Sequence, residues 1–86
     1  MTPRFAPGVR LHEDKARGRT VVMAPERMFV PDEIALAVLR LVDGQRDEAA
    51  IVAALAAQYD APEDVIAADV KVLLDDLATR GALVRG

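Results

Sequence analysis

The chain has 86 residues, 52% of them hydrophobic and none of them cysteine, with a net charge of −3. This length supports one hydrophobic core but not two, so we expect a single domain over residues 1–86. The composition excludes wholesale disorder, disulfides, thiolate metal sites and cysteine nucleophiles. No apolar run is long enough to span a membrane, and the N-terminus lacks the apolar region of a signal peptide, so we expect a cytoplasmic protein.

The N-terminal third predicts a small antiparallel sheet. Residues 1–8 contain two prolines and a glycine and should form an irregular or extended lead-in. Val9–His12 alternates apolar and polar residues, which indicates a short strand, and residues 13–18 form a charged loop that ends in glycine. Arg19–Ala24 is rich in β-branched residues and is the clearest strand of the chain.

A third short strand is predicted at Arg27–Val30, where Pro31 ends it because proline cannot continue a paired ladder. We expect this strand to lie at the edge of the sheet with unpaired backbone groups. Such an edge pairs with an incoming extended peptide, main chain to main chain. It can equally pair with the same edge of a second copy, so the sequence leaves open a monomer or an edge-strand homodimer. A purely structural subunit that dimerises through this edge is therefore an alternative function.

After the third strand, the period of the apolar pattern changes from two residues to about 3.6 residues, which predicts three helices. The first helix ends at Asp43–Gly44, and Asp47 caps the second. The third helix extends from Pro62 to Arg80, with Asp60 or Ala61 as its N-cap. The predicted buried positions are Ile34, Ala35, Val38, Leu39 and Val42 in the first helix and Ile51, Val52, Leu55 and Tyr59 in the second.

The third helix has an apolar stripe and a mixed edge. Its stripe consists of Ile66, Val70, Leu73, Leu74 and Leu77. Val65 and Val72 lie beside the stripe, in line with Asp69 and Asp76, and Gly81 ends the helix. This edge is either the border of a wide core stripe or one wall of a groove for an apolar, partly basic or amide-rich partner.

Three short strands followed by three helices predict an α+β domain, and residues 82–84 return apolar side chains to its core. The second and third helices resemble a helix-turn-helix, so the whole arrangement is winged-helix-like. A small DNA-binding or regulatory protein is therefore an alternative. The third helix, however, carries five acidic and two basic side chains and no Asn or Gln, which disfavours it as a nucleic-acid reader.

A catalytic centre is hard to assemble from this sequence. His12 is the only histidine, and the chain has no serine. The carboxylate pairs Glu63–Asp64 and Asp75–Asp76 are adjacent on a predicted helix and point in different directions. Nucleotide-binding and metal-binding motifs are absent from the sequence. We therefore expect a protein without enzymatic activity, catalytic residues, metal or cofactor.

Several short motifs together resemble the pyrroloquinoline quinone biosynthesis protein D (PqqD) family. The motifs are A-P-G-V-R-L at 6–11, R-G-R-T-V-V-M-A-P-E at 17–26, D-G at 43–44, A-D-V at 68–70, L-x-x-L-x-x-x-G ending at 81, and A-L-V at 82–84. Each motif alone is weak, whereas their order and spacing are specific. The resemblance spans nearly the whole chain.

The resemblance implies a winged-helix-like recognition element of a pathway that makes modified ribosomal peptides. Members of the family are peptide chaperones that bind the precursor peptide PqqA and present it to the radical S-adenosylmethionine (SAM) enzyme PqqE. The iron–sulfur clusters of that pathway belong to the enzyme. The guest peptide adds as a strand beside the third strand and against the third helix. The peptide-binding residues implied here are Arg27, Met28, Phe29, Val30, Val65, Asp69, Val72 and Asp76.

Overall fold

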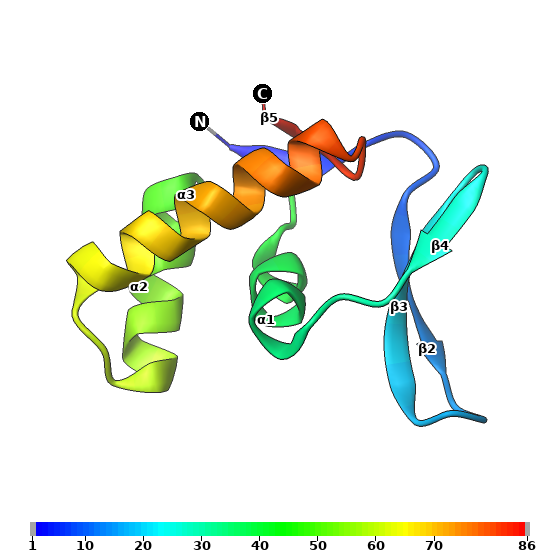
Figure 1. The fold of residues 1–86 in the computed structure, drawn as a ribbon. Helices are drawn as coiled ribbons and strands as arrows, with labels where there is room; N and C mark the ends of the chain where they lie inside the picture. Colours follow the sequence, from blue (N-terminus) through cyan, green and yellow to red (C-terminus); the bar gives the residue numbers. More distant parts are fainter. Residues whose placement is uncertain (1, 86) are drawn as a thin grey trace.

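The computed structural model describes residues 2–85 and shows an α+β fold with two small antiparallel sheets and three helices (Figure 1). The strands are β1 (Pro3–Phe5), β2 (Arg10–Asp14), β3 (Arg19–Ala24), β4 (Arg27–Phe29) and β5 (Leu83–Arg85), and the helices are α1 (Glu33–Leu41), α2 (Glu48–Tyr59) and α3 (Glu63–Thr79). The predicted three-stranded antiparallel sheet followed by three helices is therefore confirmed.

The three-stranded sheet has the order β2-β3-β4, with β3 in the centre and β4 at an edge. Its first strand extends to Asp14, two residues further than the sequence pattern predicts, because the ladder with β3 continues to the Asp14–Arg19 pair. Strand β4 pairs through Phe29 with Val22 and ends there, one residue earlier than predicted. The edge position expected for the third strand is confirmed.

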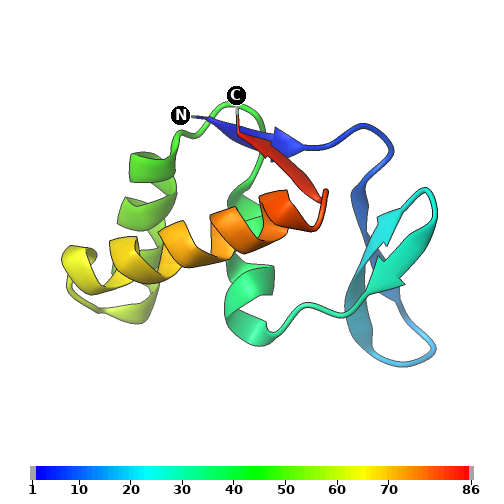
Figure 2. The same cartoon turned by 45° about the horizontal axis from the view of Figure 1, so that its top comes forward.

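The second sheet was not expected, since residues 1–8 were predicted to form an irregular or extended lead-in. Strand β1 pairs with β5 from Pro3 opposite Arg85 to Phe5 opposite Leu83. Figure 2 shows the two strands side by side, with the ends of the chain close together. Local sequence patterns do not indicate this pair, because its partners lie at opposite ends of the chain.

The predicted N-cap of the second helix is confirmed, that of the third helix is wrong, and the first helix has a cap that the sequence analysis does not predict. The side chain of Asp32 accepts a hydrogen bond from the Ala35 N–H at 2.7 Å, and Asp47 caps α2 in the same way. The predicted cap of α3 at Asp60 or Ala61 is wrong, because Asp60 ends α2 in a left-handed conformation with φ 51°. Helix α3 begins after Pro62 without a side-chain cap.

The hydrophobic core lies between the helices and the inner face of the three-stranded sheet. Its fully buried side chains include Val22, Val38, Leu39, Ile51 and Leu74. Two predicted core residues are exposed instead: Ile34 is 46% accessible and Tyr59 is 39% accessible. Ile66 and Leu73 are only partly buried. All four line an open hollow between the helices rather than the packed centre.

Candidate peptide-binding groove

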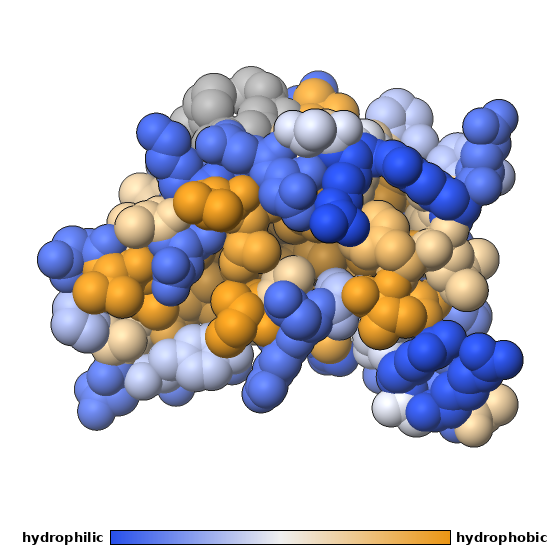
Figure 3. Space-filling model, viewed as in Figure 1, coloured by the Kyte–Doolittle hydropathy of each residue, from blue (hydrophilic) through white to orange (hydrophobic). Residues whose placement is uncertain are grey.

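A groove of about 210 Å³ separates the β4 edge from the C-terminal half of α3. Its lining residues come from β4, the linker to α1, the start of α1, and α3: Phe29, Val30, Pro31, Asp32, Ala35, Leu73, Asp76, Leu77 and Arg80. In Figure 3, hydrophobic side chains gather on this face, from the α2–α3 end of the molecule to the linker that follows β4. The groove therefore combines an apolar floor with a charged rim.

Arg80 spans the rim of this groove. Its Nε lies 3.0 Å from Oδ2 of Asp76, one helical turn earlier on α3. Its guanidinium carbon lies 5.6 Å from the centroid of the Phe29 ring on β4, a cation–π distance. Both contacts are exposed to solvent, so each is worth only a fraction of a kcal/mol to about 1 kcal/mol.

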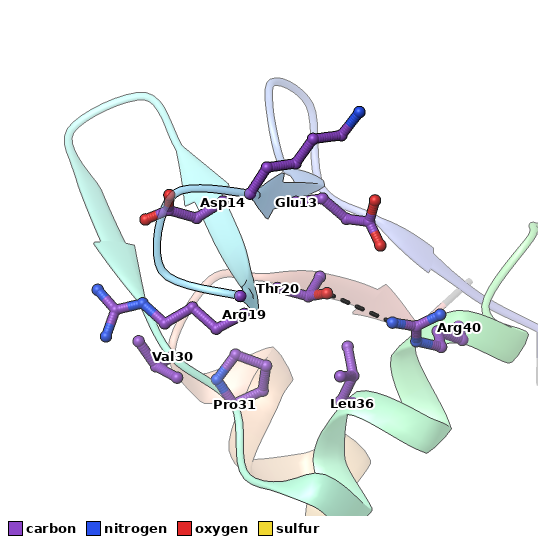
Figure 4. A pocket seen from close by; sticks show the side chains of 10 residues that line it. Glu13, Asp14, Arg19, Thr20, Val30, Pro31, Leu36 and Arg40 are labelled. Atoms are coloured by element: carbon purple, nitrogen blue, oxygen red, sulfur yellow. Dashed lines mark hydrogen bonds between the residues drawn. The ribbon is translucent and has the colours of Figure 1, made fainter.

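On its side opposite the groove, the linker between β4 and α1 borders another hollow. A hollow of about 480 Å³ lies there between the β2–β3 hairpin and α1, and Val30 and Pro31 also line it (Figure 4). Arg40 on α1 donates a hydrogen bond to the hydroxyl of Thr20 on β3 at 3.3 Å, which holds the helix against the hairpin. The charged residues around this hollow are of both signs, so its lining does not indicate one ligand.

The structure brings together only part of the residue set implied by the resemblance. Phe29, Val30 and Asp76 line the groove, and Asp69 lines the adjacent hollow on α3. Arg27 lines a separate hollow beside Gly81 at the other end of β4.

The remaining three residues of that set are exposed and line none of these hollows. Val65 and Val72 are 53% and 67% accessible on the outer surface of α3, so the interpretation of this edge as the border of a wide core stripe is wrong. Met28 is 54% accessible. It points to the opposite face of β4 from Phe29, because side chains alternate along a strand.

Sequence reasoning missed six residues that line the groove, among them Asp32 and Ala35 at the start of α1. Pro31 was identified only as a strand terminator, and Leu73 and Leu77 only as core positions of the apolar stripe. Arg80 is the last residue of the predicted helix, and its sequence position carries no sign that it reaches across to β4. The usable signal was the helical spacing of Leu73, Asp76 and Arg80, which places them on one side of α3.

Within residues 2–85, no group of three or more histidine, aspartate or glutamate side chains is arranged to hold a metal ion. His12 is exposed on β2, opposite Val21 of β3. None of the three helices described is both long and apolar enough to cross a membrane.

Comparisons with known proteins identify the family. Residues 19–83 match the family model of coenzyme PQQ synthesis protein D (PqqD). A relative from Rhodopseudomonas palustris (strain TIE-1), named PqqA binding protein, is 51% identical over 81 residues, which cover 94% of this chain and 76% of the relative. A protein of the same name from Rhizobium meliloti is 45% identical, covering 93% of this chain and 82% of that protein.

A solved structure supports the same assignment. The solution structure of the PqqD truncation of Methylobacterium extorquens PqqCD is 43% identical to this chain and superposes with a TM-score of 0.79. The match covers 96% of this chain and 88% of that one. That protein is described as a functional, stand-alone recognition element for ribosomally synthesized and post-translationally modified peptides (RiPPs). The chain whose structure is described above therefore belongs to the PqqD family of coenzyme PQQ synthesis proteins.

Proposed function

We propose that this chain is a peptide chaperone of pyrroloquinoline quinone biosynthesis. It binds the precursor peptide PqqA as an additional strand on β4 and presents it to the radical SAM enzyme PqqE. The names of the two relatives support PqqA as the guest. The observation that carries the binding mode is the open edge of β4 beside a groove whose far wall is α3.

The register of the sheet supports Met28 as the residue whose backbone pairs with the guest. Opposed residues in an antiparallel ladder alternate between hydrogen-bonded and non-hydrogen-bonded pairs. Ala24 and Arg27 close a two-residue turn and form the first, hydrogen-bonded pair, so Met28 opposite Met23 is a non-hydrogen-bonded position. The N–H and C=O of Met28 then point away from β3, toward the guest, whereas those of Phe29 point to β3.

The groove selects guest side chains once the main chain is paired. Alternate residues of an added strand face the groove, where apolar groups contact Val30 and Leu73. Asp76 is available to accept a hydrogen bond or to pair with a basic guest group when Arg80 moves aside. The chain holds and presents the peptide, and the chemistry is carried out by the enzyme, in the cytoplasm.

Binding is tested with the PqqA peptide of R. palustris, followed by amide hydrogen exchange. We expect saturable one-to-one binding in a calorimetric titration. We also expect the Met28 amide to exchange quickly in the free protein and slowly in the complex, because the guest strand accepts its hydrogen bond. The Phe29 amide serves as the internal control, since β3 protects it in both states.

Two results would contradict the proposal. If the folded protein does not bind PqqA, either alone or with PqqE added, PqqA is not its guest. Binding without added protection of the Met28 amide would reject strand addition at β4. Concentration-dependent protection of Met28 without peptide would instead indicate that two copies of the chain pair through this edge.

A further inference from the structure

The hollow that Asp69 lines is adjacent to the groove on α3. It has a volume of about 260 Å³ and lies between all three helices. Its lining is almost entirely apolar: Ile34, Leu55, Tyr59, Ile66, Val70 and Leu73, with the carboxylate of Asp69 at one side. Leu73 lines both this hollow and the groove beside β4, and Ile34 in the hollow is the neighbour on α1 of Ala35 in the groove. The two spaces are therefore adjacent.

The rim of this hollow exposes apolar surface that the fold leaves uncovered. Ile34 and Tyr59 are 46% and 39% accessible, although the helical period places both on the inward faces of their helices. In Figure 3, hydrophobic side chains from α3 and from the helices below it surround this part of the face. Sites for small molecules occupy about 300–1,000 Å³, so a smaller hollow of this kind suits one amino-acid side chain.

Asp69 adds a polar requirement at the edge of the hollow. It is the only charged residue among the described residues that line it. Asp76, one heptad later, is paired with Arg80, whereas Asp69 has no ion-pair or hydrogen-bond partner within residues 2–85. An exposed carboxylate beside an apolar hollow favours an occupant that brings a hydrogen-bond donor next to its apolar group.

We propose that this hollow is a specificity pocket for a single apolar side chain of the guest peptide, with Asp69 accepting a hydrogen bond from a donor beside it. The inference rests on the proposed function, because the occupant is the continuation of the peptide that pairs with β4. The guest residue concerned lies outside the strand-paired segment, beyond the Val30 end of β4.

Geometry sets how far along the guest this residue lies. Asp69 and Asp76 are seven residues apart on α3, which corresponds to about 10 Å along the helix axis. An extended peptide covers that distance in about three residues. An apolar guest residue about three positions beyond the last paired residue therefore reaches the hollow.

The test compares two glutamate substitutions at matched helix positions. Ile34→Glu places a charge on the rim of the hollow, in the first turn of α1 and two residues after the N-cap Asp32. Ala49→Glu places the same charge two residues after the N-cap Asp47 of α2, away from the hollow. Both changes are compatible with folding, because negative charge is favourable in the first turn of a helix. Circular dichroism and thermal melts verify that both variants fold.

With the PqqA peptide of R. palustris as the probe, Ile34→Glu is expected to weaken binding roughly tenfold or more, and Ala49→Glu to leave it unchanged. Each apolar residue of the peptide is then replaced in turn by alanine. One of these replacements should weaken binding to the wild type but should not weaken binding to the Ile34→Glu variant any further. Equal affinities of the wild type and both variants would overturn the pocket while leaving the proposed function intact. Failure of the wild type to bind would instead reject the proposed function.

Asp69→Ala tests the polar half of the proposal. We expect weaker binding, measured at low and high salt. A loss of affinity that becomes smaller at high salt identifies a cationic side chain as the donor. A loss of affinity that does not depend on salt identifies a neutral N–H. Unchanged affinity at both salt concentrations would overturn the role of Asp69.

Discussion

Arg80 bridges the two walls of the proposed binding site. In the free protein it is paired with Asp76 and lies over the ring of Phe29, so it joins α3 to β4 across the groove. A guest strand on the β4 edge enters between these two elements and must displace that bridge. We therefore expect Arg80 to compete with the guest, at a strength set by two exposed contacts.

Replacing Arg80 with alanine is expected to tighten PqqA binding roughly three- to tenfold. The two contacts that a guest would otherwise break sum to about 1 kcal/mol, and each 1.4 kcal/mol is a factor of ten. Calorimetric titration of the variant measures this change.

Arg46→Ala is the matched control for Arg80→Ala. It removes an ion pair of the same length, 3.0 Å to Asp43, at a site outside the groove. The backbone N–H groups of Arg46 and Gln45 still donate to Asp43, bonds that lower the pKa of that carboxyl and hold the turn. We expect unchanged affinity in this control. Weaker binding by Arg80→Ala would contradict the bridge and identify Arg80 as a direct contact of the guest.

At the scale of the element, α3 serves the core and the proposed site with different faces. Val70 and Leu74 are buried, whereas Asp69 and Asp76 line the two hollows. At 100° per residue, Val72 lies about 60° further around the helix than Asp69, on the exposed side of α3 and outside the lining of both hollows. A single helix thereby joins the proposed guest site to the core.

Val72→Asp separates stability from binding on this helix. The side chain is 67% accessible, so we expect the free energy of unfolding to change by about 0.5 kcal/mol or less. PqqA binding should weaken several-fold, because the family resemblance implies that Val72 contacts the peptide. Urea denaturation and titration measure the two effects. Ala53→Asp, which adds the same charge to an exposed position of α2, should affect neither. Large destabilisation by Val72→Asp would show that this face of α3 is part of the core.

At the scale of the whole molecule, the pair of β1 and β5 joins the two ends of the chain. The Ala6 N–H donates to the carbonyl of Ala82 at 3.0 Å, just after the left-handed Gly81 that ends α3. Strand β5 follows α3 directly, and β1 leads into the hairpin that carries β4. This sheet therefore helps to hold the two walls of the groove in their relative positions, although it contributes no residue to the groove.

Leu83→Ala is expected to destabilise the protein by about 2–5 kcal/mol, because Leu83 is 3% accessible and belongs to the core. Val84→Ala, on the opposite face of β5 and only partly buried, should cost clearly less. Urea denaturation at a fixed temperature gives both values. Equal losses for the two variants would contradict the difference in burial between Leu83 and Val84 on which this prediction rests.

The sequence by itself determined the local elements and the family. The aspartate that caps α2, the β-branched strand Arg19–Ala24 and the edge position of β4 were all predictable, because caps, turn residues and periodicity act over a few neighbours. The same motifs identified the PqqD family, and with it the expected guest.

Only the tertiary structure decided which surfaces face one another. The pairing of β1 with β5 joins segments about 80 residues apart, which no local pattern encodes. Helical periodicity shows that Ile34 and Tyr59 share a face with core residues, but not that this face borders a hollow. Likewise, the spacing on α3 grouped Val72 with Asp76, whereas the packing of β4 places only Asp76 in the groove. The periodicity of apolar residues specifies the direction in which a side chain points from its own helix or strand. Which residues it meets in that direction depends on how the helices and strands pack.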